Sequence, residues 1–305
     1  NSAADETNPA IAAFADGSSV VVFEDNEAGS RDLRFRIVDS AGLIGAEFDV
    51  AAGAGEQFAP KVAVLDTGNF VAVYHTGTAG NYDVQFIIRQ TNGASVASGN
   101  VEIGIDATDA SVAALTGGGF VVVFTHPVAD EDGTGVFARI YTSAGVPLPA
   151  IPFRFSVPEN AVGNQNSASV TALQDGGFLV VWDNDEAGQI NARRFDASGN
   201  AVGLEFTVAA MSDLSAPDAA LLDDGRVVIT FVNTAGTNSD IYSVIVDPRD
   251  EIINGTAGAD VITSRIEGAA VNGLDGADTL YGQAGADTLN GDGGSDILVG
   301  GGGAD

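Results

Sequence analysis

The segment LQDGGFLVVW, Leu173–Trp182, consists of an apolar residue, a tight glycine turn, an apolar run and a closing aromatic residue. Successive repeats of this arrangement end 51, 50, 58 and 49 positions apart. Repeats of this length indicate a propeller or a solenoid. The five closing aromatic residues are Phe23, Tyr74, Phe124, Trp182 and Phe231.

Each repeat contains four short segments with strand character. A strand of small residues such as PKVAVL (Pro60–Leu65) precedes the turn, and a third strand such as QINARRF (Gln189–Phe195) follows the Val-rich one. The fourth strand is clearest in AEFDV (Ala46–Val50) and LEFTV (Leu204–Val208). The Val-rich runs do not alternate with polar residues, which favours sheets that are covered on both faces, as in a propeller. The closing aromatic residues, Trp182 included, are then expected in the cores of the blades.

We therefore predict an all-β fold with a five-bladed β-propeller, built of four-stranded repeats of about 50 residues, over residues 1–250. The fifth repeat is incomplete, because only EII (Glu251–Ile253) stands where its fourth strand is expected. Either the ring closes imperfectly or further blades precede Asn1.

A second repeat, nine residues long, fills the chain from Gly255 onward. Glycine permits tight turns that expose backbone carbonyls, and a carboxylate beside them adds the oxygen ligands that calcium prefers. Two nonapeptides are expected to form one coil, roughly 4.8 Å from the next, with the aliphatic residue of each unit pointing inward. The units begin at Gly255, Ser264, Gly273, Gly282, Gly291 and Gly300. Their sixth positions are Asp260, Ala269, Asp278, Asp287, Asp296 and Asp305, and their eighth positions are Ile262, Val271, Leu280, Leu289 and Leu298.

The units GLDGADTLY, GQAGADTLN and GDGGSDILV resemble the RTX (repeats-in-toxin) calcium-binding nonapeptide family over residues 255–305. The resemblance implies a parallel β-roll over residues 251–305, with calcium held between coils by paired Asp side chains and loop carbonyls. Since Ala269 replaces Asp, the Ala269/Asp287 site is expected to be lost or weak. By position, the ion-bridging pairs are Asp260 with Asp278, Asp278 with Asp296, and Asp287 with Asp305. The implied carbonyl ligands are those of Gly255, Ala257, Gly273, Asp275, Gly282, Ala284, Gly291 and Gly293.

Charge and composition exclude several partners. The net charge is −30, and Lys61 is the only lysine, so no basic patch exists to neutralise phosphates and nucleic acid is not expected to bind. An anionic membrane surface would repel the chain, and no apolar run approaches the roughly 18 residues of a membrane-spanning helix. We expect no membrane insertion. Cysteine is absent, which excludes disulfides and a thiolate nucleophile.

The loops after the closing aromatic residues are acidic and are expected to share the ligand face of the propeller. A solvated acidic surface is the simpler interpretation, and a further calcium ion in DNDEAG (Asp183–Gly188) or ADEDG (Ala129–Gly133) is an alternative. Sequence motifs of zinc proteases, serine hydrolases and P-loop enzymes are missing, so no catalytic residue is predicted. Paired carboxylates for glycoside hydrolysis stay open. The candidate ligand-face residues are Glu24, His75, His126, Asp132, Asp183 and Asp185.

The RTX resemblance implies a secreted protein, exported in one step by a type I route with its signal beyond Asp305. The repeats of residues 1–250 also resemble the propeller repeats found beside RTX tracts in large secreted bacterial proteins. We predict a calcium-binding module for binding, adhesion or surface structure, with extracellular glycans as partners. The open alternatives are a polysaccharide-cleaving enzyme (glycoside hydrolase or lyase) on the same propeller, and a self-assembling subunit of an extracellular filament or coat.

Overall fold

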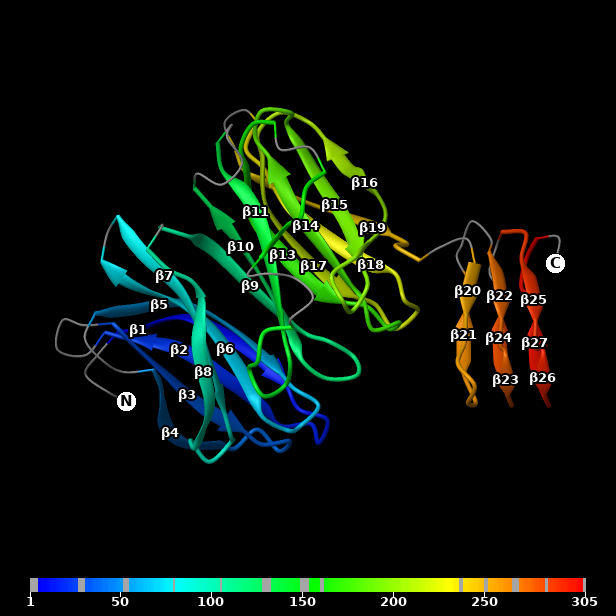
Figure 1. The fold of residues 1–305 in the computed structure, drawn as a ribbon, viewed down its shortest axis with the longest axis horizontal. Coiled ribbons are helices and arrows are strands. Elements are labelled where there is room, and N and C mark those ends of the chain that lie inside the picture. The colour runs from blue at the N-terminus through cyan, green and yellow to red at the C-terminus, as the bar shows by residue number, and fades with distance from the viewer. Residues whose placement is uncertain are drawn as a thin grey trace. The chain divides into compact units, whose positions relative to one another are not determined.

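In the computed structural model, all regular structure of the described residues is β-strand (Figure 1). The chain divides into two compact units, residues 1–220 with 229–244, and residues 221–228 with 245–305. The structure describes residues 5–26, 31–51, 55–78, 80–104, 106–127, 133–148, 154–159, 162–235, 238–249, 252–264, 269–282 and 285–303.

Antiparallel sheets follow one another along the first part of the chain, each formed by consecutive strands. The first sheet is β1 (Glu6–Ala13), β2 (Ser19–Asp25), β3 (Asp32–Val38) and β4 (Ile44–Ala51). The second is β5 (Glu56–Val64), β6 (Phe70–Thr78), β7 (Asn81–Arg89) and β8 (Ser95–Glu102). The third is β9 (Thr108–Ala114), β10 (Phe120–His126), β11 (Gly135–Tyr141) and β12 (Phe155–Ser156). The fourth is β13 (Gln165–Ala172), β14 (Phe178–Asn184), β15 (Gln189–Phe195) and β16 (Ala201–Ala210).

The fifth repeat forms a sheet of three strands within the described residues, β17 (Leu214–Leu221), β18 (Val227–Asn233) and β19 (Asp240–Val246). The all-β fold is therefore confirmed, and four-stranded antiparallel sheets are confirmed for the first four repeats. The number of blades in a closed ring stays a prediction.

The turn between the first two strands is built in the same way in successive sheets. In the fourth sheet, the backbone N–H of Leu173 donates to the carbonyl of Gly177 at 2.9 Å, and that of Gly176 donates back to Leu173 at 3.2 Å. Gly176 has a φ of +88°, in the left-handed region that side chains with a Cβ rarely adopt. The glycine of each repeat thus fixes the hairpin that aligns the small-residue strand with the Val-rich strand.

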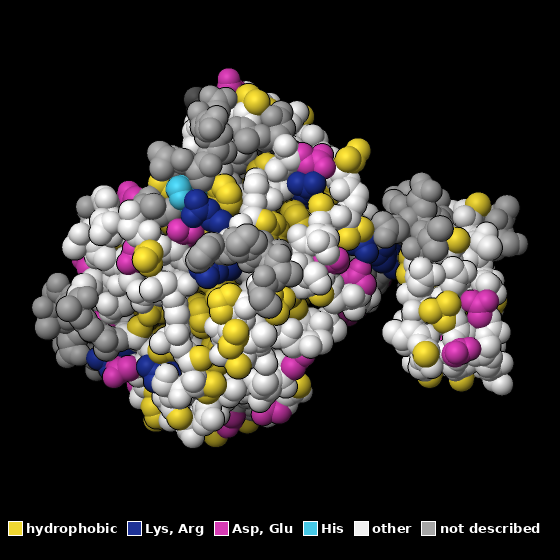
Figure 2. Space-filling model, viewed as in Figure 1, with side chains coloured by type: hydrophobic (Ala, Val, Ile, Leu, Met, Phe, Trp, Pro, Cys, Tyr) yellow, Lys and Arg dark blue, Asp and Glu magenta, His cyan; other side chains and the backbone are white. Residues whose placement is uncertain are grey.

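Acidic residues occupy two different environments. Figure 2 shows Asp and Glu side chains scattered in small groups over the face in view. A smaller set is buried, which is uncommon for carboxylates unless they are paired. The buried carboxylates among the described residues are Glu24, Asp25, Asp183, Asp278 and Asp287.

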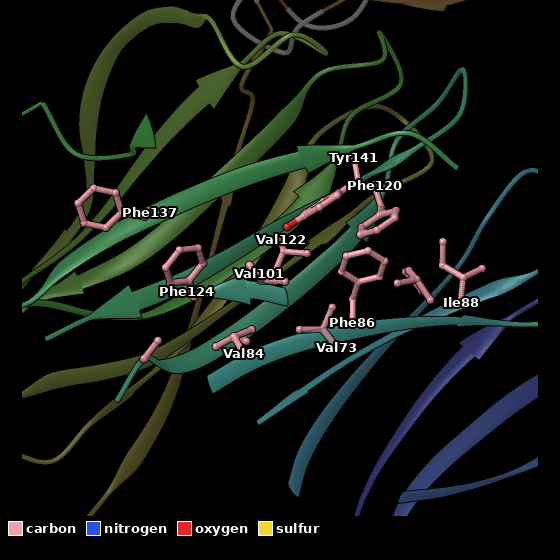
Figure 3. Packing of buried hydrophobic residues seen from close by; sticks show 14 of the residues in the cluster. Val73, Val84, Phe86, Ile88, Val101, Phe120, Val122, Phe124, Phe137 and Tyr141 are labelled. Atoms are coloured by element: carbon pink, nitrogen blue, oxygen red, sulfur yellow. The ribbon is translucent and has the colours of Figure 1, made fainter. Parts of the chain in front are cut away.

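The Val-rich strands form the interior of the sheets. All seven residues of β10 are buried, and Trp182 at the end of the run in β14 is 0 % exposed, as expected for a core aromatic residue. Figure 3 shows the core between the second and third sheets, where Phe86 of β7 lies against Phe120 and Tyr141. Its ring centroid is 5.3 Å from that of Phe120 and 4.8 Å from that of Tyr141. The apolar faces of neighbouring sheets therefore cover one another.

The nonapeptides form a parallel β-roll, which confirms the predicted architecture of this segment. Strands pair in register with strands 18 residues away, as Val261 with Thr279 and Thr279 with Ile297, so two nonapeptides make one coil. Val271 and Leu280 are 0 % exposed in its core. One sheet contains β20 (Ile252–Asn254), β22 (Ala270–Asn272) and β25 (Thr288–Asn290). The other contains β21 (Val261–Thr263), β24 (Thr279–Tyr281) and β27 (Ile297–Val299), and a turn ladder joins β23 (Asp275–Gly276) to β26 (Gly293–Gly294).

Candidate propeller face and calcium site

A β-bulge interrupts the first strand of the first four sheets at the same place. In the fourth sheet Asn166 pairs with Asp183 and Ser169 pairs with Val181, so Ser167 and Ala168 together lie opposite Trp182. Bulges of this kind are common beside binding sites, where they redirect side chains. The residue that follows the closing aromatic residue therefore lies beside a bulge in each of these sheets.

The backbone conformation near this bulge is the same in every repeat, although the residue type is not. One residue in each first strand has a positive φ between 48° and 52°, fifteen positions before the closing aromatic residue. Sequence reasoning missed these positions because they share no residue type. The only signal is the proline that follows three of them, Pro9, Pro60 and Pro217. The positions are Asn8, Ala59, Asp109, Ser167 and Ala216.

Two predicted ligand-face residues join neighbouring sheets instead of standing free in loops. Glu24 is 1 % exposed at the end of β2, and its Oε1 accepts the backbone N–H of Ala59 in the second sheet at 2.7 Å. His75 is 4 % exposed in β6, and its Nε2 accepts the backbone N–H of Ala110 in the third sheet at 3.5 Å. Burial lowers the pKa of His75 from its ordinary value of 6.5, which suits a neutral acceptor. Both side chains satisfy backbone donors at the bulge of the next sheet.

Asp183 occupies the matching position in the fourth sheet but lacks the same contact. It is 2 % exposed, and within the described residues its Oδ1 has no hydrogen-bond partner. Burial raises the pKa of Asp183 from 3.8 to about 6, while hydrogen bonds from the Ser167 side chain and the Asn166 backbone partly oppose that rise. The charges of Asp185 and Asp109 raise the pKa further. The site can therefore hold or release a proton near neutral pH.

The remaining candidate residues differ in exposure. His126 is buried at the end of β10, whereas Asp185 is exposed and its Oδ2 accepts a hydrogen bond from Asn166 Nδ2 at 3.0 Å. Thr125, which the sequence did not single out, matches His75 and Asp183 in register, and its buried Oγ1 has no partner among the described residues. Asp132 lies outside the described residues.

Position-six carboxylates of the roll are arranged in columns. The backbone N–H of Asp260 donates to Oδ1 of Asp278 at 2.9 Å, and that of Asp278 donates to Oδ1 of Asp296 at 3.0 Å. On the other side of the coil, the N–H of Ala269 donates to Oδ1 of Asp287 at 2.9 Å. The structure thus brings together two of the three predicted pairs, and it keeps the same backbone contact where Ala replaces Asp.

Asp278 is the most informative member of these columns. Its side chain is 1 % exposed, and its Oδ2 has no hydrogen-bond partner in the described part of the chain. Glycine backbone surrounds it, because a Cβ on Gly273 would run into Oδ2 and a Cβ on Gly276 would lie 3.0 Å from Oδ1. A buried carboxylate costs several kcal/mol unless a cation or donors compensate it. The orphaned oxygen and the glycine carbonyls fit a calcium ion.

A model of the RTX calcium-binding nonapeptide repeat matches residues 247–264 and 272–305, as four copies. The roll is a set of RTX repeats. RTX nonapeptides bind calcium, which agrees with the buried, unpartnered Oδ2 of Asp278. The match is interrupted at residues 265–271, inside the RTX unit that begins with Ser264 and carries Ala269.

The individual calcium ligands within the RTX repeats stay predictions. The first-position glycines form columns like the carboxylates, since a Cβ on Gly255 would lie 2.6 Å from the carbonyl oxygen of Gly273, and one on Gly273 would lie 3.0 Å from that of Gly291. Asp305 and Ala284 lie outside the described residues. Among the residues that the structure covers, no three His, Asp or Glu side chains gather closely enough to hold a metal ion by themselves.

Solved structures resemble the chain in fold. A protein of unknown function from Dyadobacter fermentans aligns with a TM-score of 0.59 and 12 % identity, over 81 % of this chain and 80 % of that one. An endo-arabinase from Bacteroides thetaiotaomicron aligns with a TM-score of 0.50 and 13 % identity, over 80 % and 94 %. At this identity the likeness concerns the propeller-like fold alone. No curated protein matches the chain.

Among the described residues, no helix has the length and apolar character needed to span a bilayer.

Proposed function

We propose that this protein is a secreted module whose RTX roll folds on calcium and whose propeller-like part binds extracellular glycans. The calcium-binding part of this proposal rests on the buried, unpartnered Oδ2 of Asp278, which lies among glycine backbone. Calcium at extracellular concentrations supplies the missing charge, since extracellular sites bind with dissociation constants of roughly 0.1–1 mM. We further propose that residues 1–250 and 251–305 are separate folding domains.

The glycan half rests on the bulge of the fourth sheet. Asp183, Asp109 and Asp185 interact electrostatically there, and Asp183 keeps one carboxylate oxygen without a partner among the described residues. Carboxylates accept hydrogen bonds from neutral sugar hydroxyls. Acidic sugars would be repelled unless calcium bridged them. The fold likeness to an endo-arabinase supports a glycan partner only by analogy.

Binding is tested by retention on a panel of neutral and acidic polysaccharides, with calcium and with chelator. Asp183→Asn and Asp185→Asn each remove charge while keeping shape, and we expect both to weaken retention of the same polysaccharide. Asp66→Asn is the matched control, because Asp66 is exposed in the turn between β5 and β6. Retention that is unchanged in both variants, or equally weakened in the control, would contradict the proposal.

Cleavage of a polysaccharide is the second candidate function. The raised pKa of Asp183, about 6, beside two further carboxylates is the pattern of a general acid in glycoside hydrolysis. Release of reducing ends from the same panel tests this. If Asp183→Asn abolishes release and leaves retention intact, the enzyme hypothesis replaces the binding one.

We also propose one-step type I export. A roll that needs calcium to fold suits a route that exports unfolded chains. The test compares secretion of the full-length protein from hosts with and without a type I exporter. A filament or coat subunit is the remaining alternative, and ordered assembly on addition of calcium, followed by light scattering, would favour it.

A further inference from the structure

His75 contacts the backbone of the bulge in the third sheet. In that bulge Asp109 and Ala110 together lie opposite Phe124, and Asp109 has a φ of +52°. His75 Nε2 accepts the backbone N–H of Ala110 at 3.5 Å, and a hydrogen bond also joins the imidazole to the backbone of Ala107. The imidazole thus contacts the chain on both sides of Asp109. A residue with a Cβ adopts this left-handed conformation at a cost, so surrounding contacts must hold it there.

The imidazole makes this contact in its neutral form. A ring nitrogen that accepts an N–H carries no proton. Burial lowers the pKa of His75, while the backbone of Ala107 and the charge of Asp109 oppose part of that fall. The Phe58 ring stacks on the imidazole with centroids 5.4 Å apart, and the Arg31 guanidinium lies over the same ring, 4.5 Å from its centroid. Protonation of His75 would add a second cation to this stack, which also favours the neutral form. The charged and titratable groups that contact the stack or the backbone beside it are Arg31, Glu56, Tyr82, Asp106 and Asp109.

Asp109 is the contribution of the third sheet to the proposed glycan site. Its side chain is exposed. Burial is the main cause of the raised pKa of Asp183 in the fourth sheet, and the charge of Asp109 adds to that rise. In the first sheet, Glu24 holds the bulge residue Ala59 of the second sheet as His75 holds the third, but Ala59 has no carboxylate. Of these two bulges, only that of the third sheet carries a group that can bind a ligand.

We propose that His75 is a positioning residue for glycan binding, whose neutral imidazole fixes the bulge of the third sheet and so keeps the Asp109 carboxylate beside Asp183. This inference rests on the proposed glycan site. His75 is 4 % exposed, so it acts through the backbone and not by touching the ligand. A protonated Nε2 is a donor and can no longer accept the N–H of Ala110. Because folding lowers the pKa of His75, the contact is intact above the ordinary value of 6.5 and is lost as pH falls below it.

The first test needs no ligand. It follows the Asp183 carboxylate by carbon-13 NMR in a pH titration of the full chain at saturating calcium, with the signal assigned by its absence in Asp183→Asn. Because the charge of Asp109 adds to the rise that burial causes, Asp109→Asn should lower the pKa of Asp183. His75→Leu should lower it in the same direction, and the double variant should lower it no further than Asp109→Asn does. An unchanged pKa in His75→Leu, or a further fall in the double variant, would overturn the proposal.

Two further variants separate positioning from stability. His75→Gln keeps an acceptor for the N–H of Ala110 but cannot titrate, so the pKa of Asp183 should match that of the wild type. Arg89→Gln is the matched control, because Arg89 Nη2 donates to the carbonyl of Val50 at 2.7 Å and joins the second sheet to the first. It should destabilise the fold without changing the pKa of Asp183. A fall in the control equal to that in His75→Leu would overturn the proposal, since general destabilisation would then explain both.

The second test measures retention of the same variants on three immobilised neutral polysaccharides, a glucan, a galactan and a xylan. At a pH of about 7.5, His75→Leu and Asp109→Asn should each weaken retention about tenfold, the scale of a lost hydrogen bond to a charged group, and His75→Gln should behave as the wild type. On acidification to a pH of about 5, the wild type should lose more retention than His75→Gln does, because His75 gains a proton and the amide does not.

The outcomes of the second test distinguish the two proposals. If the wild type is retained on none of the three polysaccharides, the proposed function is wrong, and the role of His75 in binding is wrong with it. If the wild type is retained and His75→Leu is retained equally, the proposed function stands and only the role of His75 is overturned. Equal loss of retention in acid for the wild type and His75→Gln would also overturn that role.

Discussion

The backbone N–H of Asp260 donates to Oδ1 of Asp278 at 2.9 Å, although 18 residues separate the two along the chain. Asp278 therefore uses Oδ1 to hold the preceding coil, while Oδ2 has no partner among the described residues. In the proposed calcium site, this one carboxylate would join coil stacking to ion binding. Folding of the roll and binding of calcium are thermodynamically linked through this arrangement.

Removal of calcium should unfold the roll and spare the propeller-like part. Without an ion, close carboxylates repel one another and the glycines favour a disordered chain, whereas the core around Phe86 and Phe120 needs no ion. We expect hydrogen exchange in strands β22, β24 and β25 to become slow only at calcium concentrations of roughly 0.1–1 mM. Equal protection of these strands in chelator and in calcium would contradict the linkage.

Asp278→Asn should separate the two roles of this side chain. The amide oxygen can still accept the N–H of Asp260, but the charge beside both neighbouring carboxylates is lost, so calcium affinity should fall about tenfold or more. Isothermal calorimetry on the full chain measures the change. Asp292→Asn is the matched control, since Asp292 is exposed in the same roll and is not at the sixth position. Equal affinities for the two variants would argue against Asp278 as a ligand.

Gly273→Ala should weaken calcium binding through steric conflict alone. The new Cβ would run into Oδ2 of Asp278, which must move away from the position it needs for an ion. In Gly258→Ala the nearest atom to the new Cβ is Thr256 Oγ1 at 3.7 Å, an ordinary contact. The calcium midpoint of hydrogen exchange should rise for the first variant and stay unchanged for the second.

Asp183 should make the stability of the propeller-like part depend on pH. Its pKa is raised from 3.8 to about 6, so the folded state binds the proton more tightly than the unfolded state does. The free energy of unfolding should therefore fall as pH rises from about 4 through about 6. An asparagine at this position cannot titrate, so Asp183→Asn lacks this pH-dependent loss. The difference in the free energy of unfolding between the variant and the wild type should rise by on the order of 2 kcal/mol across that range. Denaturant titrations at saturating calcium measure this change, and the exposed Asp185→Asn should show a much smaller one.

Glu24→Ala should destabilise the contact between the first two sheets. It leaves the N–H of Ala59 without its acceptor and removes the partner of Asn8 Nδ2, which costs about 1–3 kcal/mol for a buried donor. Asp66→Ala, at an exposed turn, should change the free energy of unfolding by less than about 0.5 kcal/mol. Similar values for the two variants would show that Glu24 is not a structural contact.

The regular part of the fold was predictable because it depends on spacing. Two nonapeptides per coil, with aliphatic residues inward, follow from the Gly and Asp intervals. Val271 and Leu280 confirm this, whereas Leu298 in the last described coil is 46 % exposed. The four-stranded repeats follow from the glycine turns and the Val-rich runs. In both cases a short-range pattern specifies the backbone directly.

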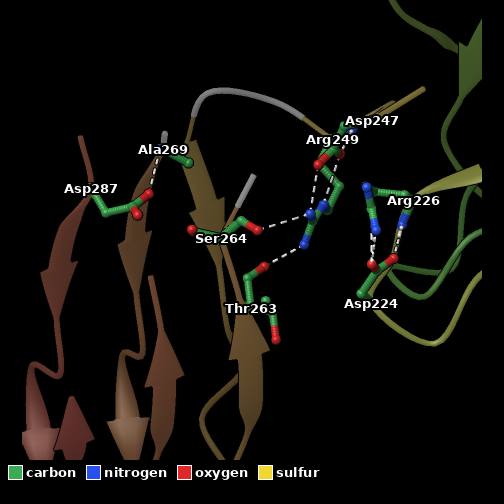
Figure 4. Close-up of polar contacts among 8 residues, drawn as sticks. All are labelled: Asp224, Arg226, Asp247, Arg249, Thr263, Ser264, Ala269 and Asp287. Carbon is green, nitrogen blue, oxygen red and sulfur yellow. Dashed lines mark hydrogen bonds and ion pairs between the residues drawn. The ribbon is translucent and has the colours of Figure 1, made fainter. Parts of the chain in front are cut away.

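The candidate sites were less predictable because they depend on burial and on contacts between distant residues. The acidic composition of the segments after the closing aromatic residues predicted that Glu24 and Asp183 lie exposed in loops. The structure instead places both at strand ends beside the bulges, where neighbouring sheets cover them. Arg249 precedes the first nonapeptide, and only the folded chain brings it to the carbonyls of Thr263 and Ser264 (Figure 4). No local pattern encodes either arrangement.

The burial of Asp278 also has a kinetic consequence. If Asp278 holds calcium as proposed, an ion at a carboxylate that is 1 % exposed is expected to leave only when neighbouring coils separate. The rate of calcium loss from the middle of the roll is then set by coil opening and not by the strength of the ion's own bonds. A brief fall in external calcium would leave the roll folded, and only a sustained fall would open it.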